Sequence, residues 1–503
     1  MPTAARTATG VPEATRASSW RAALTPRVLR IELVSGLMVA LALIPEAISF
    51  SIIAGVDPRV GLFASFTMAV TIAFTGGRPA MISAATAAVA LVVGPLAREH
   101  GLDYLVVAVM LGGVIQVILA LLGVAKLMRF IPRSVMVGFV NALAILIAMA
   151  QLPHLTGKPW AVFALAAAGL VVIALWPRLT TAVPAPLVAI VLVTAVVAVA
   201  GIDVPTVGDE GALPDGLPGL FVPDVPLTLE TLRIVLPYAL GMALVGLLES
   251  LMTAKLVDDI TDTHSDKTRE AWGQGVANIV TGLFGGMGGC AMIGQTTINV
   301  RAGGARTRVS TLAAGVFLLI LIVALGDVVA AIPMAALVAV MLFVAWATFD
   351  WHSIRPSTLR RMPRSETAVM LVTVAVVVPT GNLAYGVVAG VLLASVLFAR
   401  RVAHLAEVSG GEVADGARRY TVAGELFFAS SNDLYSQFDY AGDPARVVID
   451  MTDSHVWDAS TVAALDAVET KYASLGKTVE IVGLNDASRA MHGRMSGHLG
   501  AGH

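Results

Sequence analysis

The chain carries one string twice, as Ala80-Met81-Ile82-Ser83-Ala84-Ala85-Thr86 and in altered form as Ala291-Met292-Ile293-Gly294-Gln295-Thr296-Thr297. A phenylalanine and glycines precede each copy, at 74–77 and at 284–289. Irregular, Gly-rich backbone inside a membrane is tolerated only where protein buries it or a cavity adjoins it. The two copies therefore predict two half-helices, one in each half of a duplicated membrane domain.

Two further matches have a similar spacing. Ile131-Pro132 and Ile332-Pro333 are 201 residues apart, and Glu46 and Glu249 are 203 residues apart. Chance similarity among helices rich in alanine and glycine is the alternative explanation. Three features at nearly the same offset favour duplication.

Composition places the chain in a membrane. Of 503 residues, 57% are hydrophobic and 14% charged, whereas about a quarter of an ordinary soluble domain is charged. The net charge of −2 suggests no nucleic-acid partner. The single cysteine, Cys290, excludes intramolecular disulfides and cysteine-ligated metal clusters.

Apolar runs predict fourteen spans, because about twenty apolar residues cross a hydrocarbon core ~30 Å thick. The predicted spans are 31–53, 59–76, 80–96, 104–124, 132–151, 160–176, 182–201, 232–254, 271–286, 290–302, 309–326, 328–348, 366–380 and 382–399. The fourteen spans divide into two repeats of seven. Because seven is odd, the first repeat ends on the opposite side of the membrane from its start, so the second repeat enters from that opposite side. Inverted repeats are typical of secondary transporters, whose sites lie near the middle of the membrane where broken helices meet.

Basic residues predict the orientation, because they accumulate in cytoplasmic loops. With the N-terminus inside, the even-numbered loops contain Arg78, Lys126, Arg129, Arg133, Arg178, Lys267, Arg269, Arg301, Arg306, Arg308, Arg355, Arg360, Arg361 and Arg364. The longest loop of the opposite side, 202–231, has six acidic residues and no Lys or Arg. We expect a cytoplasmic tail at 1–30, not a cleavable signal, and a transport domain at 31–402 with repeats of about 31–201 and 232–402.

The chain changes character from residue 403 to 503. Short β-branched or apolar runs at 420–428, 447–450 and 479–483 alternate with a helical pattern at 461–474. Strands that alternate with helices predict a small α/β domain.

The two repeated strings suggest an anion site. A helix N-terminus exposes unpaired N–H groups and a partial positive charge, which suits an anion without a basic residue. The candidate side-chain donors are Ser83 and Thr86 in one string and Gln295, Thr296 and Thr297 in the other. Small residues can instead serve close helix packing, and for Ala84 and Ala85 that alternative is equally open.

Glu46 is the sharpest single signal. It follows Pro45 within an otherwise uncharged stretch, 33–56, and a proline in a helix frees backbone polar groups. A carboxyl group at membrane depth indicates function and favours its protonated form, so Glu46 is a candidate proton carrier. A purely structural carboxyl is the alternative. For Glu249, structural and proton-coupling roles stay equally open.

A metal site or an enzyme is not expected. The residues Asp258, Asp259, Asp262 and His264 resemble a metal cluster in composition, but their spacing matches no known ligand pattern. We expect a solvated surface there, no metal and no cofactor. The sequence offers no nucleophile–base pair either.

Taken together, the membrane spans and the C-terminal domain resemble the sulfate permease (SulP) family of anion transporters with a C-terminal STAS domain. The resemblance runs from about Arg30 to Leu484. The motifs that carry it are Glu32-Leu33-Val34-Ser35-Gly36, Ile44-Pro45-Glu46-Ala47, Ala54-Gly55-Val56-Asp57-Pro58, Leu248-Glu249-Ser250, Thr253-Ala254-Lys255, Asp258-Asp259 and Gly275-Val276-Ala277-Asn278.

The resemblance implies a core domain that moves against a gate domain, with the anion between the third and tenth half-helices. The implied site residues are Glu46, Phe50, Ala85, Thr86, Ala87, Glu249, Gln295, Thr296 and Thr297. It also implies a homodimer in the bacterial inner membrane, with the STAS domain in the cytoplasm. Similar bacterial members carry C4-dicarboxylates, bicarbonate or sulfate.

Departures from the family refine these expectations. Many relatives have glutamine at the position of Glu46, so the acid favours proton over sodium coupling. Many have arginine at the position of Thr296, so a positive charge is missing and Glu249 loses a partner. We expect proton-coupled symport of a carboxylate such as fumarate; bicarbonate or sulfate symport, and an anion channel or exchanger, are the alternatives.

The STAS part departs from its family as well. The stretch Asp458-Ala459-Ser460-Thr461 resembles an Asp-Ser-Ser-Gly loop that is phosphorylated at its second serine in soluble anti-sigma-factor antagonists. Thr461 replaces the final glycine. Ser460 is therefore the candidate regulatory residue.

Overall fold

The computed structural model describes residues 25–124, 126, 131–180, 183–214, 216–226, 228–403, 407–414 and 416–497. Most of the expected N-terminal tail lies outside these residues, as do Arg129 and Asp215. The chain forms two compact units, Met1–Val391 and Leu392–His503.

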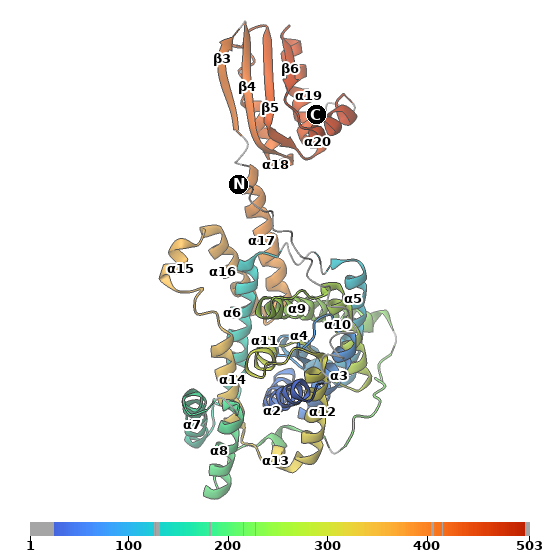
Figure 1. The fold of residues 1–503 in the computed structure, drawn as a ribbon, viewed down its shortest axis with the longest axis vertical. Coiled ribbons are helices and arrows are strands. Elements are labelled where there is room, and N and C mark those ends of the chain that lie inside the picture. Colours follow the sequence, from blue (N-terminus) through green and yellow to red (C-terminus); the bar gives the residue numbers. More distant parts are fainter. Residues whose placement is uncertain are drawn as a thin grey trace, which may run out of the picture. The chain divides into compact units, whose positions relative to one another are not determined.

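The first unit is mainly helical (Figure 1). The helices of its first half are α2 (Pro26–Ala54), α3 (Pro58–Thr75), α4 (Ala87–His100), α5 (Leu102–Leu121), α6 (Arg133–Ala150), α7 (Trp160–Leu175) and α8 (Ala185–Ala200). Those of the second half are α9 (Leu229–Thr261), α10 (Lys267–Leu283), α11 (Ile293–Thr297), α12 (Arg308–Ala324), α13 (Gly326–Ala330), α14 (Met334–Thr348), α15 (Pro356–Arg361), α16 (Arg364–Thr380) and α17 (Leu383–Ala403), the last of which runs on into the second unit.

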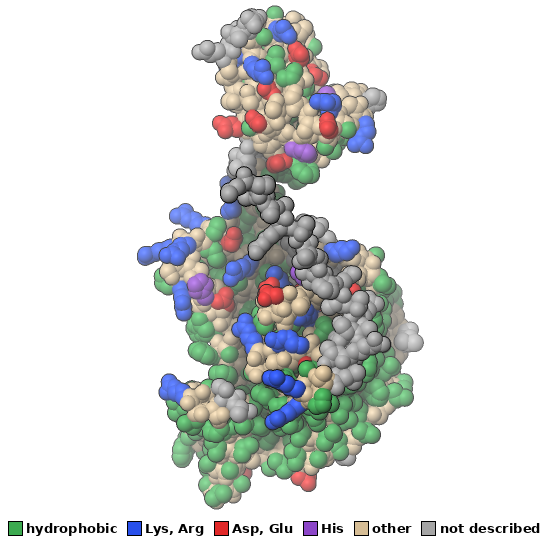
Figure 2. All heavy atoms as spheres, in the orientation of Figure 1, with side chains coloured by type: hydrophobic (Ala, Val, Ile, Leu, Met, Phe, Trp, Pro, Cys, Tyr) green, Lys and Arg blue, Asp and Glu red, His purple; other side chains and the backbone are tan. Residues whose placement is uncertain are grey.

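Each predicted span overlaps a helix, but the helices differ in length. Seven helices of the described residues are long and apolar enough to cross a membrane by length and composition alone, and α8, α12 and α14 are apolar but shorter. Hydrophobic side chains cover much of the visible surface of this unit (Figure 2). Val191, Val196 and Val199 on α8 are exposed. A helical membrane fold is confirmed, and the number of fourteen spans stays a prediction.

The repeated strings meet where two chain segments cross. Strand β1 (Ser83–Ala84) pairs antiparallel with β2 (Cys290–Ala291), with Ser83 opposite Ala291 and Ala84 opposite Cys290. Gly289 packs so closely on Ala84 that an added Cβ would collide with the Ala84 carbonyl. The strand pair gives backbone groups of both broken segments partners inside the protein, as membrane depth requires.

Helices leave this crossing in both halves of the unit. Thr86 caps α4, and its hydroxyl accepts a hydrogen bond from the Val89 N–H at 3.3 Å. Helix α11 follows β2 after Met292 and continues as a π-helical turn, Ile298–Ala302. The expected half-helices are therefore present in both halves.

A buried amide holds the second broken segment in place. Asn278 of α10 accepts a hydrogen bond from the Gly289 N–H at 2.9 Å and donates to the Gly289 carbonyl at 3.1 Å. Its side chain also donates to Gln116 of α5 at 3.0 Å. The position of β2 is thus fixed by two neighbouring helices.

The second unit is a small α/β domain with its own core. Its sheet has the order β3 (Glu407–Ala414), β4 (Ala417–Leu426), β5 (Arg446–Val456), β6 (Thr478–Val482), antiparallel at the first pair and parallel at the others. Its helices are α18 (Phe428–Ser436), α19 (Ala459–Ser474) and α20 (Asp486–Met495). Val447, Ile449, Leu465 and Tyr472 are among its fully buried core residues.

Candidate functional site

A cavity of about 450 Å³ lies beside the crossing of the two broken segments. Residues of α2, α4, α9 and α11 line it together with residues of α6, α8 and α14. The polar side chains that line it are Glu46, Thr86, Glu249, Gln295 and Thr348; no lysine or arginine lines it among the residues described. This volume falls within the range of small-molecule sites.

Two helix starts face the cavity. Ala87 and Ala88 of α4 and Ile293 and Gly294 of α11 belong to its lining. The first N–H groups of a helix have no partner within the helix and carry its partial positive charge. A Cβ added at Gly294 would meet no atom within 4 Å, so the start of α11 is open to the cavity.

Glu46 reaches the cavity from α2, which contains Pro45 within its length. The Ser49 hydroxyl donates to the Pro45 carbonyl at 2.7 Å. Phe50 lies one turn after Glu46 and also lines the cavity, as the i, i+4 spacing of a helix face requires. The Glu46 carboxyl group interacts with the side-chain amide of Gln295.

Glu249 is connected to the start of α4 through a thiol. The Cys290 Sγ donates to Glu249 Oε2 at 3.0 Å and lies 3.1 Å from the Thr86 hydroxyl. Next to Glu249, the Ser250 hydroxyl accepts from the Ala291 N–H at 3.1 Å. Helix α9 therefore binds β2 at two points, through the Cys290 side chain and the Ala291 backbone N–H.

Four of the residues proposed from the sequence do not line the cavity. Ala84 lies in β1, and the Ala85 N–H donates to the Ser65 hydroxyl at 3.2 Å. The Thr296 hydroxyl accepts from the Ile82 N–H at 3.0 Å, and the Thr297 hydroxyl donates to the Ile293 carbonyl at 2.8 Å. The Thr296 contact joins the two strings, the Ala85 contact joins the first string to α3, and the Thr297 contact lies within α11.

Ser83 is also engaged away from the cavity. Gln274 of α10 donates to its hydroxyl at 2.6 Å. The first string thus contributes Thr86 and the start of α4 to the cavity, and its other polar groups to packing.

Several residues of the cavity carried no signal in the sequence. The apolar lining residues among them include Phe139 and Leu143 of α6, Pro186 of α8 and Phe343 of α14. Apolar residues of this kind occur all round a membrane helix, so nothing marks the face that meets a cavity. Cys290 directly precedes the second string, and only this position in the sequence connects it with the site.

The expectation of a solvated acidic surface near 258 is wrong for Asp258. Its carboxylate pairs with Arg78 at 3.1 Å and with Lys267 at 2.7 Å, and its side chain is 17% exposed. Arg78 also donates to Thr263 at 2.8 Å. The loop after span two folds back on the end of α9, which the sequence spacing did not indicate.

The candidate regulatory residue of the second unit is exposed. Ser460 lies in the first turn of α19, after Asp458, which caps this helix by accepting from the Thr461 N–H at 3.0 Å. Asp458 also accepts from the Phe428 N–H at 2.6 Å. A phosphate at a helix N-terminus is electrostatically favourable.

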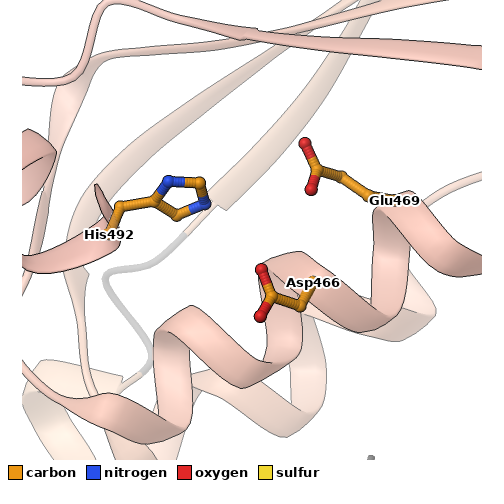
Figure 3. A group of neighbouring side chains, drawn as sticks. All are labelled: Asp466, Glu469 and His492. Carbon is orange, nitrogen blue, oxygen red and sulfur yellow. The ribbon is translucent and has the colours of Figure 1, made fainter. Parts of the chain in front are cut away.

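A second group of titratable residues lies in the same unit. Asp466 and Glu469 of α19 and His492 of α20 have side-chain ligand atoms within 4.8 Å of one another (Figure 3). Burial raises the pKa of Glu469. Both Asp466 oxygens accept hydrogen bonds, from the Ser496 hydroxyl at 2.6 Å and the Gly497 N–H at 2.9 Å. The group thus ties the end of α20 to α19.

Comparisons with known proteins agree with this architecture. The model of the sulfate permease family matches residues 29–160 and 158–373, and the model of the STAS domain matches residues 412–497. A Bacillus subtilis protein named "Putative sulfate transporter YbaR" is 53% identical over 468 residues, which cover 93% of this chain and 97% of that protein. A Picosynechococcus protein named "Bicarbonate transporter BicA" is 26% identical over 504 residues, which cover 88% of this chain and 87% of that protein.

One solved structure shows the same fold over nearly the whole chain. It is that of the murine Slc26a9 anion transporter in the inward-facing state, with a TM-score of 0.83 and 17% sequence identity. The match covers 98% of this chain and 92% of that chain.

Proposed function

This chain belongs to the sulfate permease family of anion transporters, and we propose that it is a proton-coupled symporter of a small carboxylate, with a C4-dicarboxylate such as fumarate as the first choice. The observation that supports this proposal best is the composition of the cavity. It combines two helix starts with two carboxyl side chains, Glu46 and Glu249, and no basic residue among the described residues that line it.

The helix starts supply the attraction for an anion. The starts of α4 and α11 direct partial positive charge and N–H groups to the cavity from both halves of the unit. Thr86 adds a hydroxyl, which already caps α4. Half-helix ends of this kind bind anionic substrates in other secondary transporters.

The two carboxyl groups supply the coupling. Two like charges about 6 Å apart repel by roughly 3 kcal/mol at an effective dielectric constant of about 20. An anion in this cavity therefore favours the protonated forms of Glu46 and Glu249. By linkage, protonation favours anion binding to the same extent, which is the thermodynamic basis of symport.

Sulfate and bicarbonate are the alternative substrates. The similar proteins named above are named sulfate and bicarbonate transporters. Sulfate and fumarate both bring two charges into a cavity without a described lysine or arginine in its lining, and hydrogen carbonate brings one. Charge alone therefore does not separate sulfate from fumarate, and the two are compared directly in the uptake assay. An anion channel or exchanger would bind the anion at the same helix starts but would not need the two carboxyl groups for proton coupling.

We also infer the setting of the transporter. The transport domain extends over 31–402, with repeats of about 31–201 and 232–402, and the STAS domain and tail over 403–503. The protein is a homodimer of the bacterial inner membrane with both termini in the cytoplasm. Of the predicted substrate-binding residues, those that line the cavity are Glu46, Phe50, Thr86, Ala87 and Gln295, with Glu46 and Glu249 proposed for proton coupling. Ala84, Ala85, Thr296 and Thr297 lie outside the lining and stay predictions from the sequence.

Uptake into liposomes tests the proposal. Purified protein is reconstituted, and labelled fumarate, bicarbonate and sulfate are presented with an inward proton gradient, an inward sodium gradient or neither. We expect the proton gradient to accelerate fumarate uptake, and a protonophore to abolish the acceleration. Acceleration by the sodium gradient alone would show that proton coupling is wrong.

A further inference from the structure

The segment 349–366, which joins α14 to α16, carries four arginines. These are Arg355, Arg360, Arg361 and Arg364. All four are exposed, and Figure 2 shows basic side chains gathered over α15. None of them takes part in an ion pair of the described residues. The acids of the segment are Asp350 and Glu366, so its positive charge is in excess.

One of these arginines lines a pocket. A cavity of about 270 Å³ lies beside α15, and its lining consists of His352, Ser357, Thr358, Arg361 and Met362. The His352 Nε2 lies 3.3 Å from the Thr358 Oγ1, so these two polar side chains meet in the lining. A guanidinium group beside hydroxyl and imidazole groups is a set of donors that suits phosphate oxygens.

The pocket is built on an anchored loop. Asn141 of α6 donates from its amide to the Ser353 hydroxyl at 2.9 Å and accepts from the Asp350 N–H at 2.8 Å. The Ser353 hydroxyl also donates to the Asp350 carbonyl at 2.6 Å. The backbone on both sides of His352 is therefore held against α6.

Exposed apolar side chains belong to the same part of the chain. They are Trp346 near the end of α14 and Trp351, Ile354 and Leu359 after it. The Trp351 indole donates to the Trp346 carbonyl at 2.9 Å, and its ring lies 4.7 Å from that of Phe349. Tryptophans of membrane proteins gather at the boundary between headgroups and acyl chains. A phospholipid can use this apolar surface together with the pocket, whereas a free phosphate ion uses the pocket alone.

The predicted orientation of the chain accounts for only part of this arrangement. Basic residues accumulate in cytoplasmic loops wherever they stand in the loop. Orientation requires neither a polar pocket around one arginine nor exposed tryptophans beside it. Basic pockets on the cytoplasmic side of other membrane proteins bind anionic lipid headgroups.

We propose that the segment 349–366 binds the headgroup of an anionic phospholipid, with the phosphate in the pocket against Arg361. The other three arginines supply the positive field that favours an anionic lipid over a zwitterionic one. This inference does not depend on which anion the transport cavity carries, because the two cavities share no lining residue.

Binding of labelled lipid tests the proposal. Full-length purified protein in a non-ionic detergent is titrated with phosphatidylglycerol or phosphatidylcholine that carries a fluorophore on an acyl chain, and anisotropy reports binding. We expect phosphatidylglycerol to bind at least about fivefold more tightly, since each arginine near anionic lipid contributes about this factor. Equal or absent binding of the two lipids would overturn the proposal.

Soluble competitors separate a lipid from a free phosphate. Inorganic phosphate and glycerol phosphate carry the same anionic group without acyl chains. At millimolar concentration they should leave the labelled phosphatidylglycerol bound, because they cannot use the apolar surface. Complete displacement by either one would show a site for free phosphate and overturn the assignment to a lipid.

Substitution of Arg361 tests the pocket itself. Arg361→Gln should lower the affinity for phosphatidylglycerol about fivefold and leave that for phosphatidylcholine unchanged. Arg178→Gln is the matched control, because Arg178 is an exposed arginine beside the exposed Leu179, in another loop predicted to be cytoplasmic and outside both cavity linings. The control should stay within about twofold of the wild type. An equal loss in both variants would show diffuse surface charge in place of a site, and wild-type affinity of Arg361→Gln would equally overturn the proposal.

Discussion

Cys290 donates a hydrogen bond to Glu249 across 3.0 Å, between the broken segment of the second repeat and helix α9. The same sulfur lies 3.1 Å from the Thr86 hydroxyl, which caps the half-helix of the first repeat. The thiol is fully buried. A single side chain thus joins a candidate coupling carboxyl group to a candidate anion-binding helix start.

Cys290→Ala should weaken transport, because it leaves the Glu249 carboxyl and the Thr86 hydroxyl without this partner. An unsatisfied buried polar group costs about 1–3 kcal/mol, so we expect roughly a tenfold slower uptake and a lower melting temperature. Cys290→Ser is the control, because its hydroxyl still donates; it should stay within about threefold of the wild type. Equal activity of both variants would show that the thiol has no positioning role.

The crossing of β1 and β2 should not tolerate a larger residue at Gly289. A Cβ there would collide with the Ala84 carbonyl, which cannot move without breaking the strand pair. Gly289→Ala should therefore reduce the melting temperature and abolish anion binding, since overpacking of a tight site costs about 1–3 kcal/mol. Gly294→Ala is the matched control, because open space surrounds that position; its melting temperature should not fall.

The repeated strings allowed the two half-helices to be predicted, because glycines followed by small and hydroxyl residues interrupt otherwise continuous apolar spans. The strings did not show which of their side chains face the cavity. Thr296 points to Ile82 of the other repeat, and a helix of five residues has no periodicity from which a face can be read. A tertiary contact made 214 residues away decides its orientation.

Charged residues show the same limit. Glu46 was recognisable because an acid in a long apolar run is costly. Asp258 was not, since its partner Arg78 lies 180 residues away and both stand in stretches that look like loops. Phe139 and Phe343 of the cavity wall are typical of any membrane helix.

The second unit should lose stability in acid through Asp450. Hydrogen bonds from Thr452 and Arg419 lower the pKa of Asp450 from 3.8 to about 2. A carboxyl group with a depressed pKa stabilises the fold above its unfolded value, and this contribution disappears as the pH falls from about 4 to 2. Because Arg419 is 60% exposed, screening reduces the contribution to about 1 kcal/mol.

The isolated fragment 405–503 is suitable for this measurement, since it has its own core. The denaturant midpoint of Asp450→Asn should be lower than that of the wild type at pH 7 and equal to it at pH 2. Glu480→Gln is the control, because both members of the Arg446–Glu480 pair are more than half exposed. A wild-type midpoint for Asp450→Asn at pH 7 would contradict the prediction.

Deletion of residues 405–503 should weaken transport or trafficking and leave the membrane fold intact. All residues of the cavity lining precede residue 405, and the two compact units have separate cores. The truncated protein should elute as a single species in detergent and bind substrate with wild-type affinity. Loss of binding would show that the C-terminal unit contributes to the site.

Glu46→Gln should separate proton coupling from anion binding. Glutamine keeps the size of the side chain and its capacity to hydrogen-bond to Gln295, but it has no titratable proton. If Glu46 carries the coupling proton, the variant should lose accumulation driven by a proton gradient and keep substrate binding and passive exchange. Glu99→Gln is the matched control, because Glu99 is an exposed carboxyl group outside the cavity lining.

The other roles of Glu46 predict different results in the same assay. A residue that only shapes the cavity would let Glu46→Gln accumulate substrate as the wild type does, with the same dependence on the proton gradient. A structural carboxyl group would lower the melting temperature together with all activity, since a buried group left partly unsatisfied costs about 1–3 kcal/mol. Uptake with and without a proton gradient, measured beside thermal stability, assigns the variant to one of these three roles. Wild-type pH dependence in Glu46→Gln would transfer the proton-carrier role to Glu249, whose carboxyl group is the other one in the described lining of the cavity.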